Sequence, residues 1–403
     1  MKKIKKTIDI FDNVALISFL LFIFLFVYFF YIALTSSPND INELDSLGQH
    51  IPLAKSILEG GLFDPPQLHN GLGYYLPIGE IILSVFMWFG IPLGSYNLVA
   101  LVLLFFLCYK LAMRVGMHVN LAIVFSFSIT YVNSILRLVP TQKNDVWLDV
   151  FFVWVLYLIL RPKMSIKYFL TLGVAVGLLV GVKYSGIILA LIVLGGNFNN
   201  IKYFITNTNI IVFLFPVTIL GIIWYARNYV LTGNPFYPIS LFSFVGHPEF
   251  MVPQGYENFL HSNSMALTIE ALISEYLIWS FIPLYLLYLA IFKGVSMFKE
   301  VKPLLIIGGL SSIVYFLGPT DFTRVNITSN VRFMHPVFIA LILSTFLIAK
   351  KIDRERELIV ISILSSIAVM SQFTYFPKMI MIWLILVFFI LQLPKKILQF
   401  KLR

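Results

Sequence analysis

Residues 13–34 read NVALISFLLFIFLFVYFFYIAL, a run of 22 residues without one charged side chain. An α-helix rises about 1.5 Å per residue, so about 20 apolar residues cross a hydrocarbon core of about 30 Å. Similar runs recur along all 403 residues, which are 59% hydrophobic and only 12% charged. This composition is typical of a membrane protein with many spans and excludes a soluble globular fold.

The basic segment MKKIKK at residues 1–6, which precedes this run, resembles the start of a secretion signal. The apolar run is longer than the hydrophobic region of a signal, and no small-residue cleavage site follows it, so we expect an uncleaved first span. The whole chain predicts an all-α fold of about twelve transmembrane helices. The expected spans lie near 13–34, 95–113, 118–137, 146–160, 168–183, 185–199, 210–226, 268–292, 303–318, 332–349, 358–376 and 379–393.

Residues 77–92, PIGEIILSVFMWFGIP, decide the topology. The segment is apolar but short, begins with Pro77 and contains Glu80, which favours a helix lying in the membrane interface. If it stays outside, 21 of the 29 Lys and Arg residues are cytoplasmic, whereas if it spans, only 11 are. The positive-inside rule therefore favours two cytoplasmic termini in a plasma-membrane protein. It predicts long external loops at 35–94 and 227–267 within one transmembrane domain, 1–403, and no soluble C-terminal domain.

The formal charge of +10 does not indicate a nucleic-acid partner. The basic residues stand at the ends of apolar runs instead of clustering with aromatic residues on a polar face, and this is a topology signal. The single cysteine, Cys108, lies inside an apolar run. The sequence therefore predicts contact with membrane lipids, without a disulfide framework or a cysteine-based metal site.

Acidic residues gather in the first predicted external loop. Residues 39–64, NDINELDSLGQHIPLAKSILEGGLFD, hold five carboxylates and one histidine. Residues 45–59 show helical spacing of apolar residues and end at Gly60, which predicts an amphipathic helix on the membrane surface. The expected apolar stripe is Leu47, Ile51, Ala54 and Leu58. Asp45 lies at the start of this helix, either as its N-cap or as a functional carboxylate.

Five segments, taken in order, resemble motifs of the GT-C class of glycosyltransferases, multispan enzymes that take a sugar from a polyprenyl-phosphate lipid. They are DSLGQHIP at 45–52, PTQKND at 140–145, GLLVGVKYSG at 177–186, WYARNYVLTGNPFYP at 224–238 and VRFMHP at 331–336. The likeness is to enzymes related to protein O-mannosyltransferases and aminoarabinose transferases. It implies interfacial helices in the first external loop and an active site on the external face, which is also where charge counting puts this loop.

The resemblance implies an integral membrane glycosyltransferase that moves a hexosyl or pentosyl group from a polyprenyl-phosphate donor. Such a transfer needs a base near the acceptor nucleophile and cations near the departing phosphate. The first-loop motif implies that Asp45 is the catalytic base. His50, just over one helical turn later, is expected to contact the donor or to orient Asp45.

The second-loop motif implies that Asp145 binds hydroxyl groups of the acceptor or the sugar, with an exposed loop acid as the alternative. Asp149 lies one helical turn further along the same face. An acid inside a membrane span usually lines a cavity, so Asp149 is a secondary candidate.

The remaining motifs supply cations for the phosphate. Lys183 ends a glycine-spaced span and is expected to reach either a substrate phosphate or lipid headgroups. Arg227 and Arg332 are stronger candidates because a guanidinium matches phosphate oxygens bidentately. Asn228 follows Arg227 in the same motif and is expected to bind substrate with it.

Several alternatives stay open. A divalent cation is compatible with the GT-C class, although no histidine pair has metal-ligand spacing and no metal ligand is predicted. The acceptor could be a lipid, a glycan or a protein. A lipid or sugar transporter or flippase is one other class, for which inverted repeats would be expected. An envelope polysaccharide polymerase or ligase is another, for which a large late loop would be expected.

Overall fold

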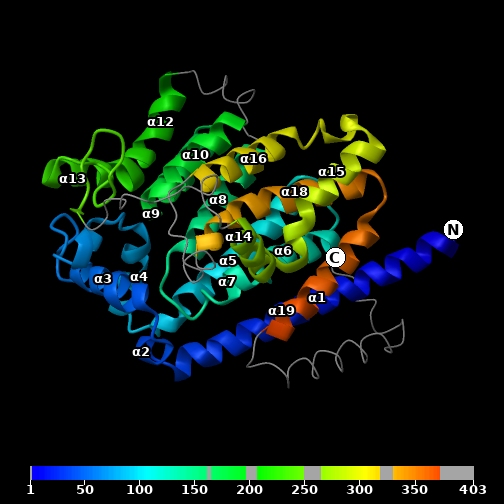
Figure 1. The fold of residues 1–403 in the computed structure, drawn as a ribbon, viewed down its shortest axis with the longest axis horizontal. Coiled ribbons are helices and arrows are strands. Elements are labelled where there is room, and N and C mark those ends of the chain that lie inside the picture. Colours follow the sequence, from blue (N-terminus) through cyan, green and yellow to red (C-terminus); the bar gives the residue numbers. More distant parts are fainter. Residues whose placement is uncertain (1, 161–164, 197–206, 249–264, 318–329, 373–403) are drawn as a thin grey trace.

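The computed structural model describes residues 2–160, 165–196, 207–248, 265–317 and 330–372. In these ranges the regular elements are helices, joined by turns and one isolated bridge between Leu241 and Phe244. The predicted all-α class is therefore confirmed for this part of the chain. Figure 1 shows the helices packed side by side, with α1 along one edge and α12 and α13 toward the opposite one.

Two long helices enclose a group of short ones in the first part of the chain. They are α1 (Lys2–Thr35) and α5 (Tyr96–Arg114), and both contain predicted spans. The segment between them forms α2 (Pro38–Ile41), η1 (Ser46–His50), α3 (Ile51–Leu58), η2 (His69–Tyr74), α4 (Ile78–Trp88) and η3 (Leu93–Ser95), where η denotes a 3₁₀ or π-helical turn. Helices are thus confirmed at both positions where interfacial helices were predicted.

The first-loop helix buries polar as well as apolar side chains within the protein. The buried residues of η1 and α3 are Ser46, Gln49, His50, Leu53 and Ala54. Of the predicted apolar stripe, Ala54 is buried, Leu47 and Ile51 are partly buried and Leu58 is 45% exposed, so contact of this stripe with the membrane surface stays a prediction. α3 packs against α4. His50 contacts Glu80 of α4 and Ser46 bonds to Glu43 and Gln142, and a polar group can be buried when it is hydrogen-bonded.

α4 is an 11-residue helix and lies against α3 and α9 (Ile166–Val182). At about 1.5 Å per residue it is about half as long as the hydrocarbon core is thick. The prediction of a short helix within 77–92 is confirmed, and its position in the membrane interface stays a prediction.

The centre of the bundle is formed by α5, α6 (Val119–Thr130), α8 (Asp145–Ile159), α9 and α10 (Tyr184–Gly196). α5 packs against α6 and α8, while α9 packs against α8, α10 and α12 (Asn207–Val217). The predicted span 118–137 was wrong at its end, because α6 stops at Thr130 and Val132 is extended before the short helix α7 (Asn133–Leu136). Asn133 there donates from its side chain to the carbonyl oxygen of Ser274, which joins α7 to α14.

Glycines let α9 approach the stretch of α12 and η5 (Thr218–Ile222) closely. A Cβ atom added at Gly173 would stand 2.3 Å from the carbonyl oxygen of Phe213, and one at Gly181 would stand 2.1 Å from that of Leu220. Small residues at such crossings are a common means of packing helices within membranes.

The second half of the chain continues this bundle. α13 (Ile223–Thr232) extends α12 and η5, and α14 (Met265–Tyr276), η7 (Leu277–Phe281) and α15 (Ile282–Lys293) follow as one broken stretch. η8 (Val295–Phe298) leads to α16 (Lys302–Leu317), which packs against α18 (His335–Lys351). η9 (Val331–Met334) precedes α18, and α19 (Glu355–Gln372) contacts α6 and η7.

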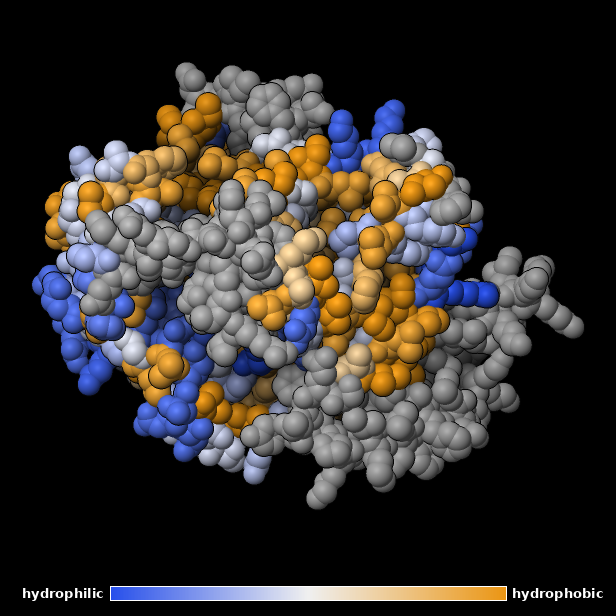
Figure 2. All heavy atoms as spheres, in the orientation of Figure 1, coloured by the Kyte–Doolittle hydropathy of each residue, from blue (hydrophilic) through white to orange (hydrophobic). Residues whose placement is uncertain are grey.

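Five helical stretches in the described ranges are long and apolar enough to cross a membrane: Val14–Thr35, Leu93–Arg114, Asn209–Thr232, Met265–Ile291 and Val331–Lys351. Five other apolar helices are shorter. The predicted span 379–393 lies outside the described residues, so the total of twelve stays a prediction. Figure 2 shows a broad hydrophobic band between two hydrophilic edges, one over the first loop and one beyond α15. This pattern is that of a membrane protein.

Candidate active site

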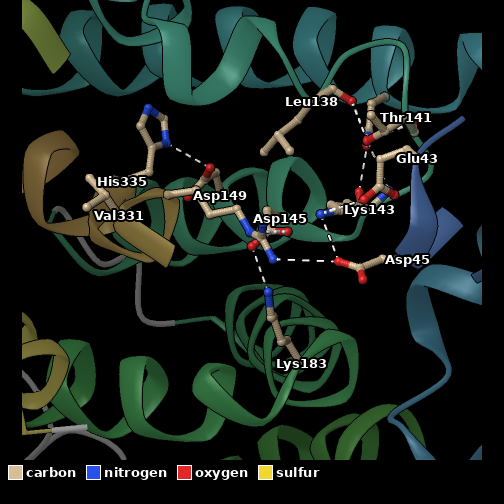
Figure 3. Close-up of polar contacts among 12 residues, drawn as sticks. Glu43, Asp45, Leu138, Thr141, Lys143, Asp145, Asp149, Lys183, Val331 and His335 are labelled. Carbon is tan, nitrogen blue, oxygen red and sulfur yellow. Dashed lines mark hydrogen bonds and ion pairs between the residues drawn. The ribbon is translucent and has the colours of Figure 1, made fainter. Parts of the chain in front are cut away.

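Four of the residues predicted for the active site lie together at the first-loop end of the bundle. Asp45 immediately precedes η1, Asp145 is the first residue of α8, Lys183 ends α9, and Arg332 lies in η9. Figure 3 shows Asp45, Asp145 and Lys183 converging from three separate elements. The tertiary fold therefore brings together motifs that are far apart in the sequence.

These side chains form a row of alternating charges, which we call the charge chain: Glu43, Lys143, Asp45, Arg332, Asp145 and Lys183. Lys143 Nζ lies 2.8 Å from Glu43 Oε1 and 2.7 Å from Asp45 Oδ2. Arg332 lies between the two aspartates, with Nη2 3.9 Å from Asp45 Oδ2 and Nε 3.3 Å from Asp145 Oδ2. Lys183 Nζ completes the row at 2.6 Å from Asp145 Oδ1.

Asp45 is the member of the charge chain that solvent reaches most. Its side chain is 48% exposed, against 7% for Asp145 and 10% for Lys143. Burial raises the pKa of Asp45, but the positive charges of Lys143 and Arg332 outweigh burial and hold that pKa below its ordinary value. Asp45 is therefore an accessible carboxylate that is ionised at neutral pH.

The loop that carries Lys143 is shaped by buried side-chain amides and hydroxyls. The side-chain nitrogen of Asn97, on α5, lies 3.1, 3.0 and 2.9 Å from the carbonyl oxygens of Leu138, Thr141 and Lys143. The backbone N–H of Gln142 donates to Ser46 Oγ at 3.0 Å, which joins this loop to the start of η1. Lys143 is thus placed between Glu43 and Asp45 by contacts that the sequence motif does not reveal.

His50, five residues after Asp45, belongs to a second, buried network. His50 Nδ1 is 2.7 Å from Glu80 Oε1, and the side chain of Asn144 donates to the same oxygen at 2.9 Å. The hydroxyl of Tyr96 donates to Asn144 Oδ1 at 2.8 Å. The network joins the first-loop helix to the residue before Asp145, which suits the predicted orienting role of His50; contact with a donor stays a prediction.

Arg227 and Asn228 lie apart from the charge chain. Arg227 Nη1 donates to the carbonyl oxygen of Leu62 at 3.0 Å, and Nη2 donates to those of Tyr74 and Tyr75 at 3.2 Å each. The side chain of Asn228 donates to the Tyr74 carbonyl oxygen at 2.8 Å. In the described ranges these contacts hold the backbone of the first loop, and the predicted binding of phosphate by this pair stays a prediction.

Sequence reasoning assigned no role in the site to four residues that the structure brings there: Glu43, Lys143, Glu80 and His335. Glu80 was noticed as an acid in an apolar segment, which was the available signal that it has a buried partner. Asp149, a secondary candidate, pairs with His335 at 2.7 Å between Oδ2 and Nδ1. Among the described residues, no three His, Cys, Asp or Glu side chains converge so that they could hold a metal ion.

A cavity of about 330 Å³ lies beside the charge chain, between α10 and α16. Its walls include Ile188 and Ile192 from α10 and Val314 from α16, and Lys183 lines it together with Phe333. Lys183 Nζ lies 4.2 Å from the centre of the Phe333 ring. The cavity thus combines apolar walls with an ammonium group that belongs to the charge chain.

Comparison with known proteins relates the chain to solved structures. No family model and no curated protein matches it. The crystal structure of ArnT from Cupriavidus metallidurans bound to undecaprenyl phosphate matches with a TM-score of 0.59 at 14% identity, over 93% of this chain and 71% of ArnT. The apo structure of ArnT matches with a TM-score of 0.57 at 13% identity, over 93% and 70%. The predicted resemblance to GT-C enzymes of the aminoarabinose transferase type is confirmed as a likeness of fold.

Proposed function

We propose that this chain is an integral membrane glycosyltransferase that moves a sugar from a polyprenyl-phosphate donor to an acceptor at the external membrane face. The observation that carries the proposal is the position of Asp45. It is a half-exposed carboxylate with Lys143 Nζ at 2.7 Å and Arg332 Nη2 at 3.9 Å. The charge chain continues from Arg332 through Asp145 to Lys183, which lines the apolar cavity. One carboxylate that a substrate reaches, with cations beside it, suits transfer from a lipid phosphate.

In the proposed reaction, the Asp45 carboxylate accepts the proton of the acceptor hydroxyl or amine as that atom attacks the anomeric carbon. The bond from the anomeric carbon to the phosphate oxygen breaks, and its electron pair leaves with the polyprenyl phosphate. Arg332 and Lys183 supply positive charge where negative charge accumulates on this leaving group. The low pKa of Asp45 keeps the base ionised before each transfer.

The cavity beside Lys183 supports a lipid donor. Its apolar lining suits part of a polyprenyl chain, and an ammonium group at its wall suits the phosphate at the end of that chain. The structure of ArnT, which has a similar fold, was solved with undecaprenyl phosphate bound. A lipid phosphate of this kind is what the donor becomes in the proposed reaction once the sugar has left it. The external position follows from the charge distribution of the sequence, which assigns the first loop to that side.

The substitution Asp45→Asn tests the proposal. Purified chain in lipid nanodiscs is given undecaprenyl-phosphate-linked pentoses and hexoses together with extracted envelope lipids as acceptors, and mass spectrometry follows release of undecaprenyl phosphate. We expect the wild type to consume at least one donor and Asp45→Asn to be slower by about 10²–10⁴-fold, the usual contribution of a general base. Glu59→Gln, which removes an exposed acid from the same loop outside the charge chain, should leave the rate unchanged.

Undiminished transfer by Asp45→Asn would refute the assignment of the base. A transporter or flippase would move the intact donor between leaflets without breaking the sugar–phosphate bond. Intact donor lipid in all samples would therefore refute the proposal that the chain is a glycosyltransferase.

A further inference from the structure

We propose that the buried pair Asp149–His335 is a positioning pair that keeps Asp145 and Arg332 in contact within the charge chain. The inference rests on the proposed function, because it concerns how the same site is kept in its active geometry. Neither residue is assigned this role by the sequence motifs, in which Asp149 is only a candidate cavity residue and His335 is unassigned.

The pair lies one helical turn below the two charged residues that it is proposed to position. Asp149 follows Asp145 by four residues on α8, and His335 follows Arg332 by three residues where η9 passes into α18. His335 Nδ1 lies 2.7 Å from Asp149 Oδ2, and both side chains are 3% exposed. Figure 3 shows this contact beside Asp145, joining the segment of His335 to α8. The two segments thus meet twice, once at the pair and once where Arg332 Nε approaches Asp145 Oδ2 at 3.3 Å.

His335 is held from two further sides. Its Nε2 lies 3.2 Å from the carbonyl oxygen of Ile129, near the end of α6, and donates to it. The ring stacks on Tyr276 of α14, with centroids 6.2 Å apart and planes inclined by 16°, and the Tyr276 hydroxyl donates to the carbonyl oxygen of Val331. The start of α18 is therefore tied to α6, α8 and α14 through this one side chain.

Breaking the contact between Asp149 and His335 is also costly. Since Nε2–H donates to a carbonyl oxygen, the short contact at Nδ1 holds one proton shared with Asp149, and the pair is neutral overall whichever atom carries it. The second oxygen of Asp149, Oδ1, has no hydrogen-bond partner among the described residues. Removing either partner leaves the other buried and unsatisfied, which strongly favours the paired arrangement.

The pair acts through Arg332 and does not touch substrate. Asp45, the accessible carboxylate, is faced by Lys143, Arg332 and His50, by Glu43 across Lys143, and by Tyr75. Of these groups, Arg332 belongs to the segment that His335 fixes. If the start of α18 shifts, Arg332 withdraws from Asp45 while Lys143, held by the loop on Asn97, remains. The pKa of Asp45 then rises.

The experiment compares Asp149→Leu with Asp149→Asn through the pH dependence of kcat. Leucine has the same branching as aspartate, although it is larger, and cannot bond to His335, so we expect kcat to fall by up to about 100-fold, as for a misplaced catalytic group, and the acid limb to move to higher pH. Asparagine can still donate to His335 Nδ1, so it should restore most of kcat and the wild-type acid limb.

Ser362→Ala is the matched control. It removes the buried contact of 2.8 Å between Ser128 and Ser362, which joins α6 to α19 away from the charge chain, and both serines are 3% exposed. This variant should keep kcat and the acid limb even if its thermal midpoint falls. Should Asp149→Leu not fold, His335→Gln provides the same comparison, because glutamine cannot bond to both Asp149 and Ile129.

An Asp149→Leu enzyme with unchanged kcat and acid limb would overturn the inference. So would an Asp149→Asn enzyme as slow as Asp149→Leu, since that result would assign a proton-transfer role to the carboxylate. A wild-type chain that transfers no sugar would instead refute the proposed function, which separates the two failures.

Discussion

At the scale of single residues, Lys143 has the most direct effect on the proposed base. Its ammonium lies within 2.8 Å of both Glu43 and Asp45 and is 10% exposed, so solvent screens its charge little. A nearby positive charge stabilises a carboxylate and lowers its pKa. Removing that charge raises the pKa of Asp45, because burial, which raises this pKa, is then opposed only by the smaller effects of Arg332 and His50.

We therefore predict that Lys143→Met raises the pKa of Asp45 and narrows the active pH range from the acid side. At a fixed acidic pH, a smaller fraction of the base is ionised and the transfer rate is lower, whereas at higher pH part of the rate returns. The measurement is the acid limb of the rate of undecaprenyl-phosphate release against pH. Lys55→Met, an exposed lysine on the same surface helix, is the control and should leave the limb in place. An acid limb that is the same in both variants would contradict this account of Asp45.

The sequence could supply Asp45, Asp145, Lys183 and Arg332 because each lies in a recognisable local motif. It could not supply the role of Lys143, which is two residues from Asp145 but makes its contacts with residues about 100 positions earlier. Whether a lysine pairs with a carboxylate depends on the distance between them in the folded chain. For Lys143 and Asp45, that distance depends on how Asn97 shapes the loop that carries Lys143.

At the scale of elements, the position of Lys183 depends on how closely α9 approaches α12 and η5. Lys183 directly follows α9, and Gly181 lies two residues before it in contact with the backbone of Leu220. A backbone atom cannot move aside as the end of a flexible side chain can. The glycine spacing noted in the sequence thus has a packing reason.

We predict that Gly181→Ala destabilises the chain by about 1–3 kcal/mol, the usual cost of overpacking, and slows transfer by displacing Lys183. Scanning fluorimetry in detergent gives the thermal midpoint, and the donor-release assay gives the rate. Gly195→Ala is the control, because a Cβ atom at that position of α10 meets no atom within 4 Å. Equal thermal midpoints for the two variants would show that the approach of α9 does not require glycine.

At the scale of the whole molecule, the charge distribution predicts which edge is external. Figure 2 shows two hydrophilic edges separated by a hydrophobic band, and the first loop occupies one of them. Lys350 and Lys351 lie at the far end of α18 from His335, which begins that helix beside the charge chain. The positive-inside rule assigns this far end to the cytoplasm.

Labelling of introduced cysteines tests the orientation. We predict that Asp64→Cys, exposed in the first loop, reacts with a membrane-impermeant maleimide added to intact cells. Glu300→Cys, at a carboxylate that is 74% exposed, should react only after the membrane is opened. Native Cys108 is fully buried and provides an unreactive background. The reverse labelling pattern would invert the topology and assign the charge chain to the cytoplasm.

By itself, the sequence determined the class of the protein, because a helix that crosses the hydrocarbon core needs about 20 mostly apolar residues, and such runs are visible in the sequence. It also determined which local motifs carry charge, and it predicted the short helix within residues 77–92. Tertiary structure alone decided that Asp45 pairs with Lys143, that Arg227 bonds to backbone carbonyl oxygens, and that Asp149 meets His335. The physical reason is that hydrophobicity is a property of each segment, whereas a buried charge is stabilised only by a partner that the folded chain brings within about 3 Å.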